Sequence, residues 1–440
     1  MGTASLFSDL PAAEQREAVP AATPAEAARV VEPVRNQVEM VWRDLDSLVA
    51  EDHPARAIWG LLEQLDLGAF YAHVRAVQGR AGRPASDPRV LLALWVYATV
   101  EGLGSARRLA ELSERDDVYR WLRGGVPLNY HLVADFRTAH QAALNELLTE
   151  IITTLLAEEL VSFKRVAQDG MRVRASAGAA SFRREATLER LRQEAHEQVE
   201  RLAAEVTEPG GQASKRERAA HGRAAQERAE RVSRALAQLP AVRALKEPTA
   251  AEQATARVST TDPDARVMKM ADGGFRPADN VELATDTGSH VVVGVTVTNA
   301  GTDTEEAAPM VAQVETRSGR RPAEYLVDGG FAPKQTVPAL AAQAITVYAP
   351  VQKPKDAARN PYAPLKGDAP AVAAWRQRMG TAEAKAIYKE RAATAECANA
   401  QCRRRYGLQQ FAVRGVNKVA CVVLLTVITH NLLRWLALTA

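Results

Sequence analysis

Two aspartates at the ends of predicted strands could contribute to a metal site. Asp328 follows the short apolar run 325–327 and precedes two glycines, and Asp169 lies in the strand-like run 163–178. Ligand groups in an open α/β sheet gather outside the carboxyl ends of its strands. With a third acid the pair would suit Mg²⁺, and two such ions about 4 Å apart can support phosphodiester cleavage. A single aspartate in this place could instead cap a helix.

Asp328 has a rival, because the sequence Asp-Gly-Gly-Phe occurs twice. Asp272, in the segment 271–277, precedes its predicted strand and lies among polar residues. Asp328, in the segment 327–333, follows a hydrophobic strand instead. Because ligand groups collect where strands end, we favour Asp328 as the second acid.

The third acid is sought on the helical stretch 384–407. Glu396, unlike Glu390, shares one side of this helix with a tyrosine and two arginines. At about 100° per residue, Tyr388, Arg391, Glu396 and Arg403 fall within an arc of roughly 140°. Between residues 376 and 418 there are ten Lys and Arg against three Glu, a net charge of +7 that favours an acidic polymer. The alternative is an amphipathic surface helix with scattered salt bridges.

The composition of the whole chain is ordinary for a globular protein. Its 440 residues are enough for several domains, and the formal net charge of +3 does not by itself indicate a nucleic-acid partner. The three cysteines suit neither a disulfide framework nor a zinc site. The N-terminus has no signal-peptide pattern, and the apolar run 419–433 is predicted to be a buried core helix, with His430 and Trp435 in the core. We therefore expect a cytoplasmic protein.

The first part of the chain is expected to contain a leader and a helical domain. Residues 1–40, rich in Ala, Pro and Glu, are interpreted as a mobile leader. Residues 41–160 have helical periodicity throughout, and Ser105 is a plausible N-cap. Arginines such as Arg107 and Arg108 suit a helix-turn-helix-like DNA-binding domain, although a helical packing or dimerisation domain fits the same pattern.

The second part of the chain, 161–440, alternates strands and helices, which predicts a mixed α/β sheet. Residues 181–256 interrupt this alternation with two charged helical arms joined by a Pro-Gly-Gly turn. We interpret them as an inserted helical hairpin. Its charges either face solvent or contact DNA or another subunit.

Several motifs together resemble the DDE transposases of bacterial insertion sequences. "VAQDGMRVRASAG" resembles the first-aspartate strand of that family, and "YLVDGGF" resembles the second. "YKERAATAECANAQCR" resembles the Tyr–Arg–Glu–Lys signature that carries the glutamate, and "GRPASDPRVLLALWVYATVEGLGSARRLAEL" resembles the helical domain that precedes the catalytic core. The resemblance covers residues 50–435. One departure is Arg403, where the signature usually has Lys, so the charge is kept while its geometry changes.

The resemblance implies a fold, a set of site residues and a cofactor. The fold would be RNase H-like, a mixed sheet with helices on both faces, interrupted by the helical hairpin and preceded by the all-α domain. Asp169, Asp328 and Glu396 would be the catalytic and metal-binding triad, with Mg²⁺ as the cofactor and Mn²⁺ as a substitute. DNA contacts are expected from Tyr388, Lys389, Arg391, Arg403, Arg404, Arg107 and Arg108.

The resemblance also implies an activity. The protein would bind the terminal inverted repeats of its own element, cleave there to free a 3′-OH, and join that hydroxyl to a phosphate of target DNA. No covalent protein–DNA intermediate is needed. A homodimer on double-stranded DNA is expected because two ends must be held together. The alternatives are an RNase H-like nuclease without strand transfer and an inactive, domesticated DNA-binding protein.

Overall fold

The computed structural model of this protein describes residues 35–36, 38, 40–79, 81, 83–207, 215–245, 249–354, 356 and 359–440. The chain separates into two compact units, Met1–Asp44 and Leu45–Ala440. Every helix and strand named below belongs to the second unit. The leader predicted over residues 1–40 lies almost entirely outside the described residues.

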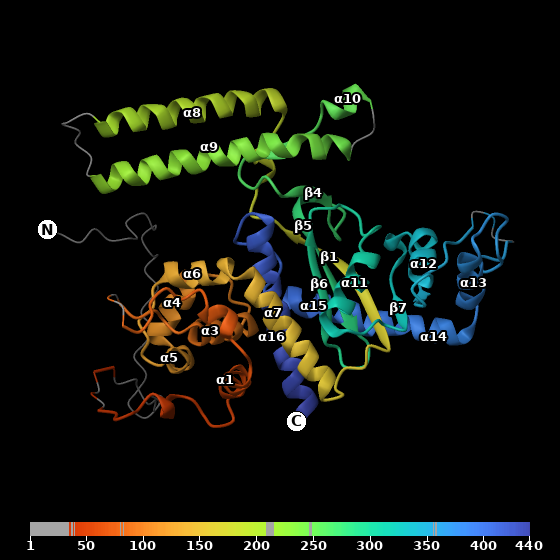
Figure 1. The fold of residues 1–440 in the computed structure, drawn as a ribbon, viewed down its shortest axis with the longest axis horizontal. Helices are drawn as coiled ribbons and strands as arrows, with labels where there is room; N and C mark the ends of the chain where they lie inside the picture. The colour runs from red at the N-terminus through yellow and green to blue at the C-terminus, as the bar shows by residue number, and fades with distance from the viewer. Residues whose placement is uncertain are drawn as a thin grey trace, which may run out of the picture. The chain divides into compact units, whose positions relative to one another are not determined.

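Helices form the first part of the second unit (Figure 1). Asp87 and Ser105 cap two of them, because their side-chain oxygens accept hydrogen bonds from the backbone N–H groups of Arg89 (2.8 Å) and Arg108 (3.3 Å). Ser105 is therefore an N-cap, as predicted. The buried helix α3 forms the centre of this region and packs against α1, α5 and α6. The elements are η1 (Asp46–Leu48), α1 (Pro54–Gln64), α2 (Gly68–Tyr71), α3 (Pro88–Val100), α4 (Ala106–Arg115), α5 (Asp117–Arg123), α6 (Tyr130–Ala139) and α7 (Gln141–Ala157).

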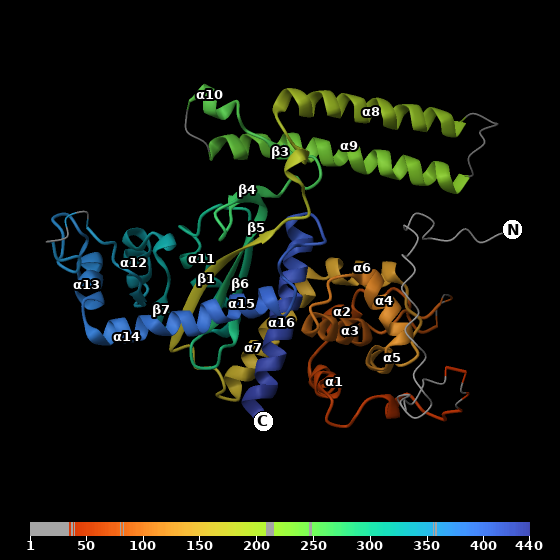
Figure 2. The ribbon, with the colours of Figure 1, turned by 180° about the vertical axis from the view of Figure 1, so that it is seen from behind.

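A mixed sheet forms the second part of this unit, with β1 at its centre (Figure 2). β5 lies antiparallel on one side of β1, and β7 and then β8 lie parallel on the other side. β4 and β6 pair with the outer edge of β5 at different points along it. The strands are β1 (Arg165–Arg174), β4 (Arg266–Lys269), β5 (Phe275–Asp286), β6 (Val292–Thr298), β7 (Glu324–Leu326) and β8 (Thr346–Tyr348). These directions and this order are those of an RNase H-like sheet, which confirms the predicted fold class.

Helices cover both faces of this sheet. α11 packs against β6 on one face, so closely that a Cβ at Gly294 would lie 3.0 Å from Val314. On the other face, β1 and β5 contact the rod that consists of α14, a π-helical turn and α15. The remaining bounds are η3 (Gly329–Phe331), α11 (Ala307–Ser318), α12 (Pro333–Ala341), α13 (Pro370–Met379), α14 (Ala382–Arg391), the π-turn (Ala392–Glu396), α15 (Cys397–Arg404) and α16 (Val416–Thr439).

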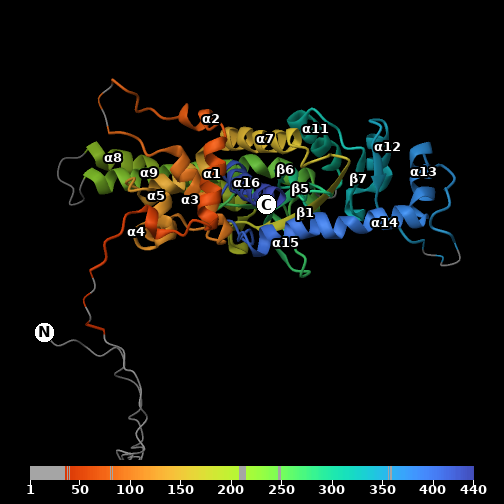
Figure 3. The same ribbon diagram turned by 90° about the horizontal axis from the view of Figure 1, so that it is seen from below.

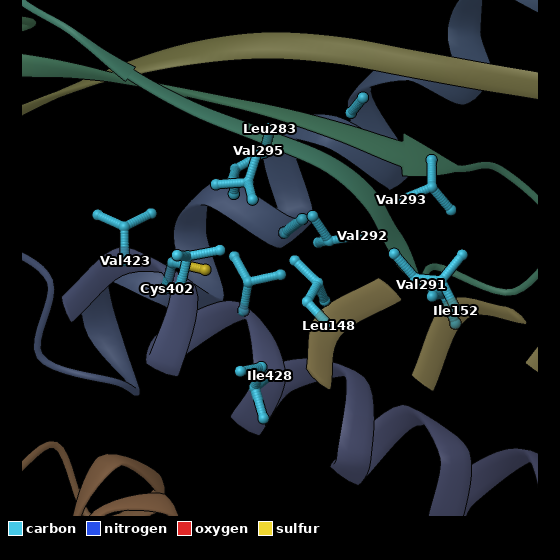
Figure 4. Packing of buried hydrophobic residues seen from close by; sticks show 14 of the residues in the cluster. Leu148, Ile152, Leu283, Val291, Val292, Val293, Val295, Cys402, Val423 and Ile428 are labelled. Carbon is cyan, nitrogen blue, oxygen red and sulfur yellow. The ribbon is translucent and has the colours of Figure 1, made fainter. Parts of the chain in front are cut away.

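The edge strand β6 is covered by two side-chain amides. Asn431 of α16 accepts a hydrogen bond from the Val292 N–H and donates one to its carbonyl, both at 2.9 Å. Gln313 of α11 makes the same pair of contacts with Val295, at 2.8 and 3.0 Å. Satisfying these backbone groups prevents β6 from pairing with another chain. Apolar residues of β5, β6, α7, α15 and α16 fill the space beside this strand (Figure 4).

Helix α16 is long and apolar enough to cross a membrane, but 78% of its apolar window is buried inside the protein. His430 and Trp435 are 2% and 5% exposed, and the His430 Nε2 lies 2.9 Å from the carbonyl oxygen of His290. Both residues belong to the core, as predicted. α16 is therefore the buried core helix that the sequence indicates.

Two long antiparallel helices stand apart from the sheet (Figure 1). α8 (Glu185–Thr207) and α9 (Lys215–Ala244) share a small apolar core of their own with Ala256, which follows α10 (Ala250–Gln253), and with Val258 of a two-stranded ribbon. Much of their charge is paired within the hairpin, for example Arg190 with Glu194 and Arg243 with Glu185. The ribbon consists of β2 (Phe182–Arg183) and β3 (Val258–Ser259), preceded by η2 (Ala179–Ser181).

Candidate active site

Asp169 lies in the middle of β1, so the prediction that it ends a strand is wrong. Gly170 does not terminate β1 but continues the ladder, where it pairs with Glu282 of β5. A Cβ at Gly170 would clash with the Glu282 carboxylate and lie 2.9 Å from Asp303 Oδ1. The glycine is therefore required by a close approach of side chains and does not mark the end of the strand.

Asp328 lies beside Asp169 because of the parallel register of their strands. The last residue pair between β1 and β7 is Ala167 with Leu326. Asp169 is two residues after Ala167, and Asp328 is two residues after Leu326. Both aspartates therefore lie just beyond the segment in which β1 and β7 pair. Asp328 also accepts a hydrogen bond from the Gly330 N–H at 2.7 Å and thus caps η3. The cap and the site are two roles of one side chain.

Glu396 is placed by a π-helical turn rather than by a regular α-helix. Residues 392–396 form this turn between α14 and α15, and the three elements run as one rod beside β1 and β7 (Figure 3). Residues five apart lie above one another in a π-turn, so Arg391 and Glu396 face the same direction. Arg391 Nη1 donates to Glu396 Oε1 at 2.9 Å.

Arg391 lies between all three predicted acids. Its Nη2 is 2.6 Å from Asp169 Oδ1 and 3.9 Å from Asp328 Oδ2, while its Nη1 binds Glu396. The Arg391 side chain is buried. Glu390, the rejected alternative to Glu396, points elsewhere and pairs with Arg165 at 2.6 Å. The structure therefore brings Asp169, Asp328 and Glu396 around one guanidinium.

The environment of Asp169 disfavours its negative charge. Burial raises the pKa of Asp169 to about 6, and the carboxylates of Asp328 and Glu396 add to the rise. Arg391 opposes it, as does Asn399, whose Nδ2 donates to Asp169 Oδ2 at 2.9 Å. Asn399 is one helical turn beyond Glu396, and no feature of the sequence predicts its role. A site with this excess of acidic groups needs a positive charge at its centre.

A pocket of about 580 Å³ opens beside Asp169 and Glu396. The predicted DNA contacts Arg403 and Arg404 line it, and Arg403 donates to the Arg172 carbonyl at 3.1 Å. Two further cations of the lining were not predicted, Arg172 and Lys269. They lie on β1 and β4, and only the folded sheet brings these strands to the C-terminal rod.

Other predicted DNA contacts lie outside this pocket. Tyr388 is half-buried and Lys389 is exposed, both on α14. Arg107 and Arg108 are on α4, in the N-terminal helical region, where Arg107 stacks over the ring of Tyr130. Arg108 pairs with Glu111 at 3.1 Å. The structure does not place these two arginines in the lining of the pocket.

The three acids are suitable ligands for a divalent metal ion. Carboxylate oxygens are the donors that Mg²⁺ and Mn²⁺ prefer. Among the described residues, however, no three Asp, Glu, His or Cys side chains are grouped closely enough to hold one ion. The Arg391 guanidinium supplies the positive charge between them instead. The donor set therefore fits a metal ion, provided that Arg391 leaves the carboxylates.

Two family models match this chain. A transposase DDE domain matches residues 368–436, which include Glu396, and a transposase domain matches residues 43–139 in the N-terminal helical region. The chain belongs to the DDE transposases of insertion sequences. No curated protein and no solved structure matches it significantly. Asp169 and Asp328 lie between the two matched segments.

Replacing Asn399 with Ala is expected to slow DNA cleavage by this transposase about 10- to 100-fold. The amide of Asn399 holds Asp169 in position, and without it the carboxylate can turn away from the other acids. The cleavage rate should be measured with increasing Mg²⁺, because a mispositioned ligand raises the metal concentration required. The matched control is Gln401→Ala on the same helix, since Gln401 contacts Cys397 rather than the acids. Equal rates for both variants would contradict a positioning role for Asn399.

A second buried acid, Glu282, lies on the other face of β1. Asn280 Nδ2 donates to both Glu282 Oε1 and Asp303 Oδ1 at 2.8 Å, and Gln168 Nε2 donates to Glu282 Oε2 at 2.9 Å. Burial, with the Asp303 carboxylate next in importance, raises the pKa of Glu282 to about 9. The fold therefore favours the protonated form of Glu282.

This raised pKa predicts that the stability of the folded protein falls as the pH rises from the acidic range. The unfolded chain releases the Glu282 proton near its ordinary pKa of 4.5, whereas the folded chain keeps it until about pH 9. The contribution of Glu282 is thus fully present below pH 4.5 and is lost as the pH rises towards 9. Glu282→Gln, which mimics the neutral acid, should flatten the decline in unfolding temperature over this range. If the unfolding temperature of Glu282→Gln declined with pH as steeply as that of the wild type, the prediction would be wrong.

Proposed function

We propose that this transposase binds the ends of its insertion sequence and catalyses metal-dependent strand cleavage and strand transfer, with Asp169, Asp328 and Glu396 as its catalytic and metal-binding residues. The observation that carries the proposal is the convergence of these acids, from β1, β7 and the π-turn, around the single buried guanidinium of Arg391. The cofactor proposed is Mg²⁺, with Mn²⁺ as a substitute.

Each group near the site has a role in this proposal. Asp169, Asp328 and Glu396 would hold the metal ion, and Asn399, which donates to Asp169 Oδ2, would keep that carboxylate in position. A bound divalent ion supplies Lewis-acid chemistry, which activates the attacking oxygen and stabilises charge on the phosphate and the leaving oxygen. Arg391 must release the carboxylates first, and is then available to contact a DNA phosphate.

The surroundings of the acids suit a DNA backbone. Arg172, Lys269, Arg403 and Arg404 line the pocket beside them and supply positive charge for phosphates. Burial raises the pKa of Tyr388, so its phenol stays protonated and acts as a hydrogen-bond donor rather than a nucleophile. Lys389, exposed on the same helix, extends the contact surface. No covalent protein–DNA intermediate is required.

The remaining parts of the proposal concern organisation and partners. The helical region before residue 161 would recognise the terminal inverted repeats, with Arg107 and Arg108 of α4 among its DNA contacts. Residues 161–440 would form the catalytic domain, with 181–256 as its helical insertion. Two element ends must react together, so we propose a homodimer on double-stranded DNA. The reaction would take place in the cytoplasm, on the nucleoid.

Strand transfer is the step that separates a transposase reaction from simple hydrolysis. A labelled duplex of the element end, already cut to expose its 3′-OH, should be joined to a supercoiled target plasmid in Mg²⁺ by the wild-type protein. Joined product should be absent with Asp328→Asn, which removes one ligand while keeping a hydrogen-bond acceptor for the Gly330 N–H. Cleavage of uncut ends without any joined product would indicate a nuclease, and binding of ends without either reaction would indicate an inactive DNA-binding protein.

A further inference from the structure

A short β-hairpin borders the pocket beside the proposed catalytic acids. It consists of β4, β5 and the turn 270–274, which is closed by a hydrogen bond from the Met270 N–H to the Gly274 carbonyl at 2.8 Å. Asp272 accepts from the Gly274 N–H and pairs with Arg276 at 2.7 Å. Lys269, Met270 and Ala271 of the hairpin contribute to the lining of the pocket. The hairpin is thus a defined structure at the edge of the site.

One face of this hairpin is apolar, cationic and exposed. Lys269 and Phe275 are directly paired across the two strands, so their side chains lie on the same face. Val267 shares this face, because successive side chains of a strand alternate. Phe275 is 69% exposed and Val267 is 50% exposed. Met268, between Val267 and Lys269, points the other way and is buried.

An exposed phenylalanine beside a lysine suits the binding of single-stranded nucleic acid. An aromatic ring stacks on the face of a base, and that face is accessible only when the base is not stacked in a duplex. The lysine neutralises the neighbouring phosphate. Lys269 of this face lines the pocket together with Arg172, Arg403 and Arg404. Its charge is therefore complementary to a DNA strand, and much less so to a basic protein surface.

We propose that the β4–β5 hairpin binds an unpaired nucleotide next to the cleaved phosphate, with Phe275 stacked on the base and Lys269 on its phosphate. This inference rests on the proposed function, since it assumes that DNA enters the pocket beside Asp169 and Glu396. The hairpin then favours DNA whose strands are separated at the cleavage position. Duplex far from the cut makes no contact with Phe275.

The test measures binding rather than cleavage, so it does not depend on catalysis. Two fluorescein-labelled duplexes of the element end are compared in EDTA: one is fully paired, and the other has about four unpaired nucleotides at the cleavage position. Wild-type protein should bind the unpaired end about tenfold more tightly. Phe275→Leu keeps an apolar side chain but removes the ring, and it should abolish this preference without weakening binding of the paired duplex. Phe275→Trp should retain the preference.

Val77→Ala is the matched control, because Val77 is a comparably exposed apolar residue (49%) outside the pocket lining. It should behave as wild type. Equal preference in wild type and Phe275→Leu would overturn the inference, as would a wild-type protein without any preference. Light scattering adds a further outcome: if Phe275→Leu loses self-association instead, the face binds a second copy of the chain and the inference is wrong. A protein that shows the preference but never cleaves DNA would contradict the proposed function, while the binding of an unpaired nucleotide by the hairpin would still be supported.

Discussion

Asp169→Asn is expected to reduce the rate of DNA cleavage by at least about a thousandfold, because a lost metal ligand removes several kcal/mol of charge stabilisation from the reaction. Asn has the size of Asp but lacks its negative charge, so the metal ion loses a ligand from the centre of β1. Binding of the element end should be unchanged, since Asp169 repels phosphate rather than attracting it. The measurement is the single-turnover cleavage rate in Mg²⁺ on a labelled end.

Unfolding of Asp169→Asn provides the control for this prediction. The pKa of Asp169 is raised to about 6, which means that the folded protein disfavours the ionised carboxylate. A neutral Asn relieves this cost but leaves the buried Arg391 guanidinium without its closest partner, so the two effects oppose each other and the unfolding temperature in EDTA should change little. Loss of cleavage together with a lower unfolding temperature would indicate damage to the fold. Cleavage at the wild-type rate would show that Asp169 is not a metal ligand.

Arg391→Ala is expected to destabilise the metal-free protein by about 3 kcal/mol, because breaking a buried ion pair leaves an uncompensated charge. Most of the lost stability comes from the ion pair with Asp169, which is the most buried of the three acids that Arg391 contacts. Glu396 and Asp328 are more exposed, so water screens their charges and their pairs with Arg391 contribute little. Mg²⁺ should restore much of this stability, since the ion can occupy the place of the guanidinium. The measurement is the unfolding temperature in EDTA and in Mg²⁺.

Arg165→Ala is the matched control for Arg391→Ala. Arg165 also bridges two acids, Glu324 and Glu390, both at 2.6 Å, but it lies outside the candidate metal site. Its loss should destabilise the protein without rescue by Mg²⁺. The wild-type protein should gain less from Mg²⁺ than Arg391→Ala does, because the ion must first displace the guanidinium. Equal Mg²⁺ effects on all three proteins would contradict the competition between Arg391 and metal.

The sequence predicts most strands of the sheet because each strand is marked by the residues within it and directly beside it. Apolar runs separated by turn residues place β5, β6, β7 and β8, and a buried strand followed by Asp328 marks the end of β7. The position of Asp169 was predicted less well, because Gly170 has two meanings in a sequence. It can end a strand, or it can make room for a neighbouring side chain, here Glu282. Only the pairing of β1 with β5 shows which meaning applies.

The central role of Arg391 is also absent from the sequence. The helical wheel assumes about 100° per residue and places Arg391 and Glu396 roughly 140° apart. The π-turn over residues 392–396 removes this separation and brings the two side chains into contact at 2.9 Å. A wheel cannot reveal a π-turn, and no pattern of spacing indicates that a guanidinium fills the site between three acids.

Residues that reach the site from distant segments were missed for a related reason. Arg172 and Lys269 are unremarkable as strand residues, and they become part of the pocket only because β1 and β4 are held side by side with the C-terminal rod. Asn399 is uncharged and is not a typical metal ligand, yet its Nδ2 donates a hydrogen bond to Asp169 Oδ2 at 2.9 Å. Sequence periodicity identifies which face of an element is buried, whereas these contacts depend on the packing of several elements.

The most direct test of the proposed site is cleavage of a labelled duplex that carries the element's own end, in Mg²⁺, by wild type and by Glu396→Gln. Glu396 is the acid whose assignment depends most on the π-turn, and Gln keeps its shape and its hydrogen-bonding capacity while removing the charge. We predict cutting at the end by wild type alone, with equal binding of the end by both proteins. Equal cutting by both would contradict the assignment of Glu396 and, with it, the three-acid site around Arg391.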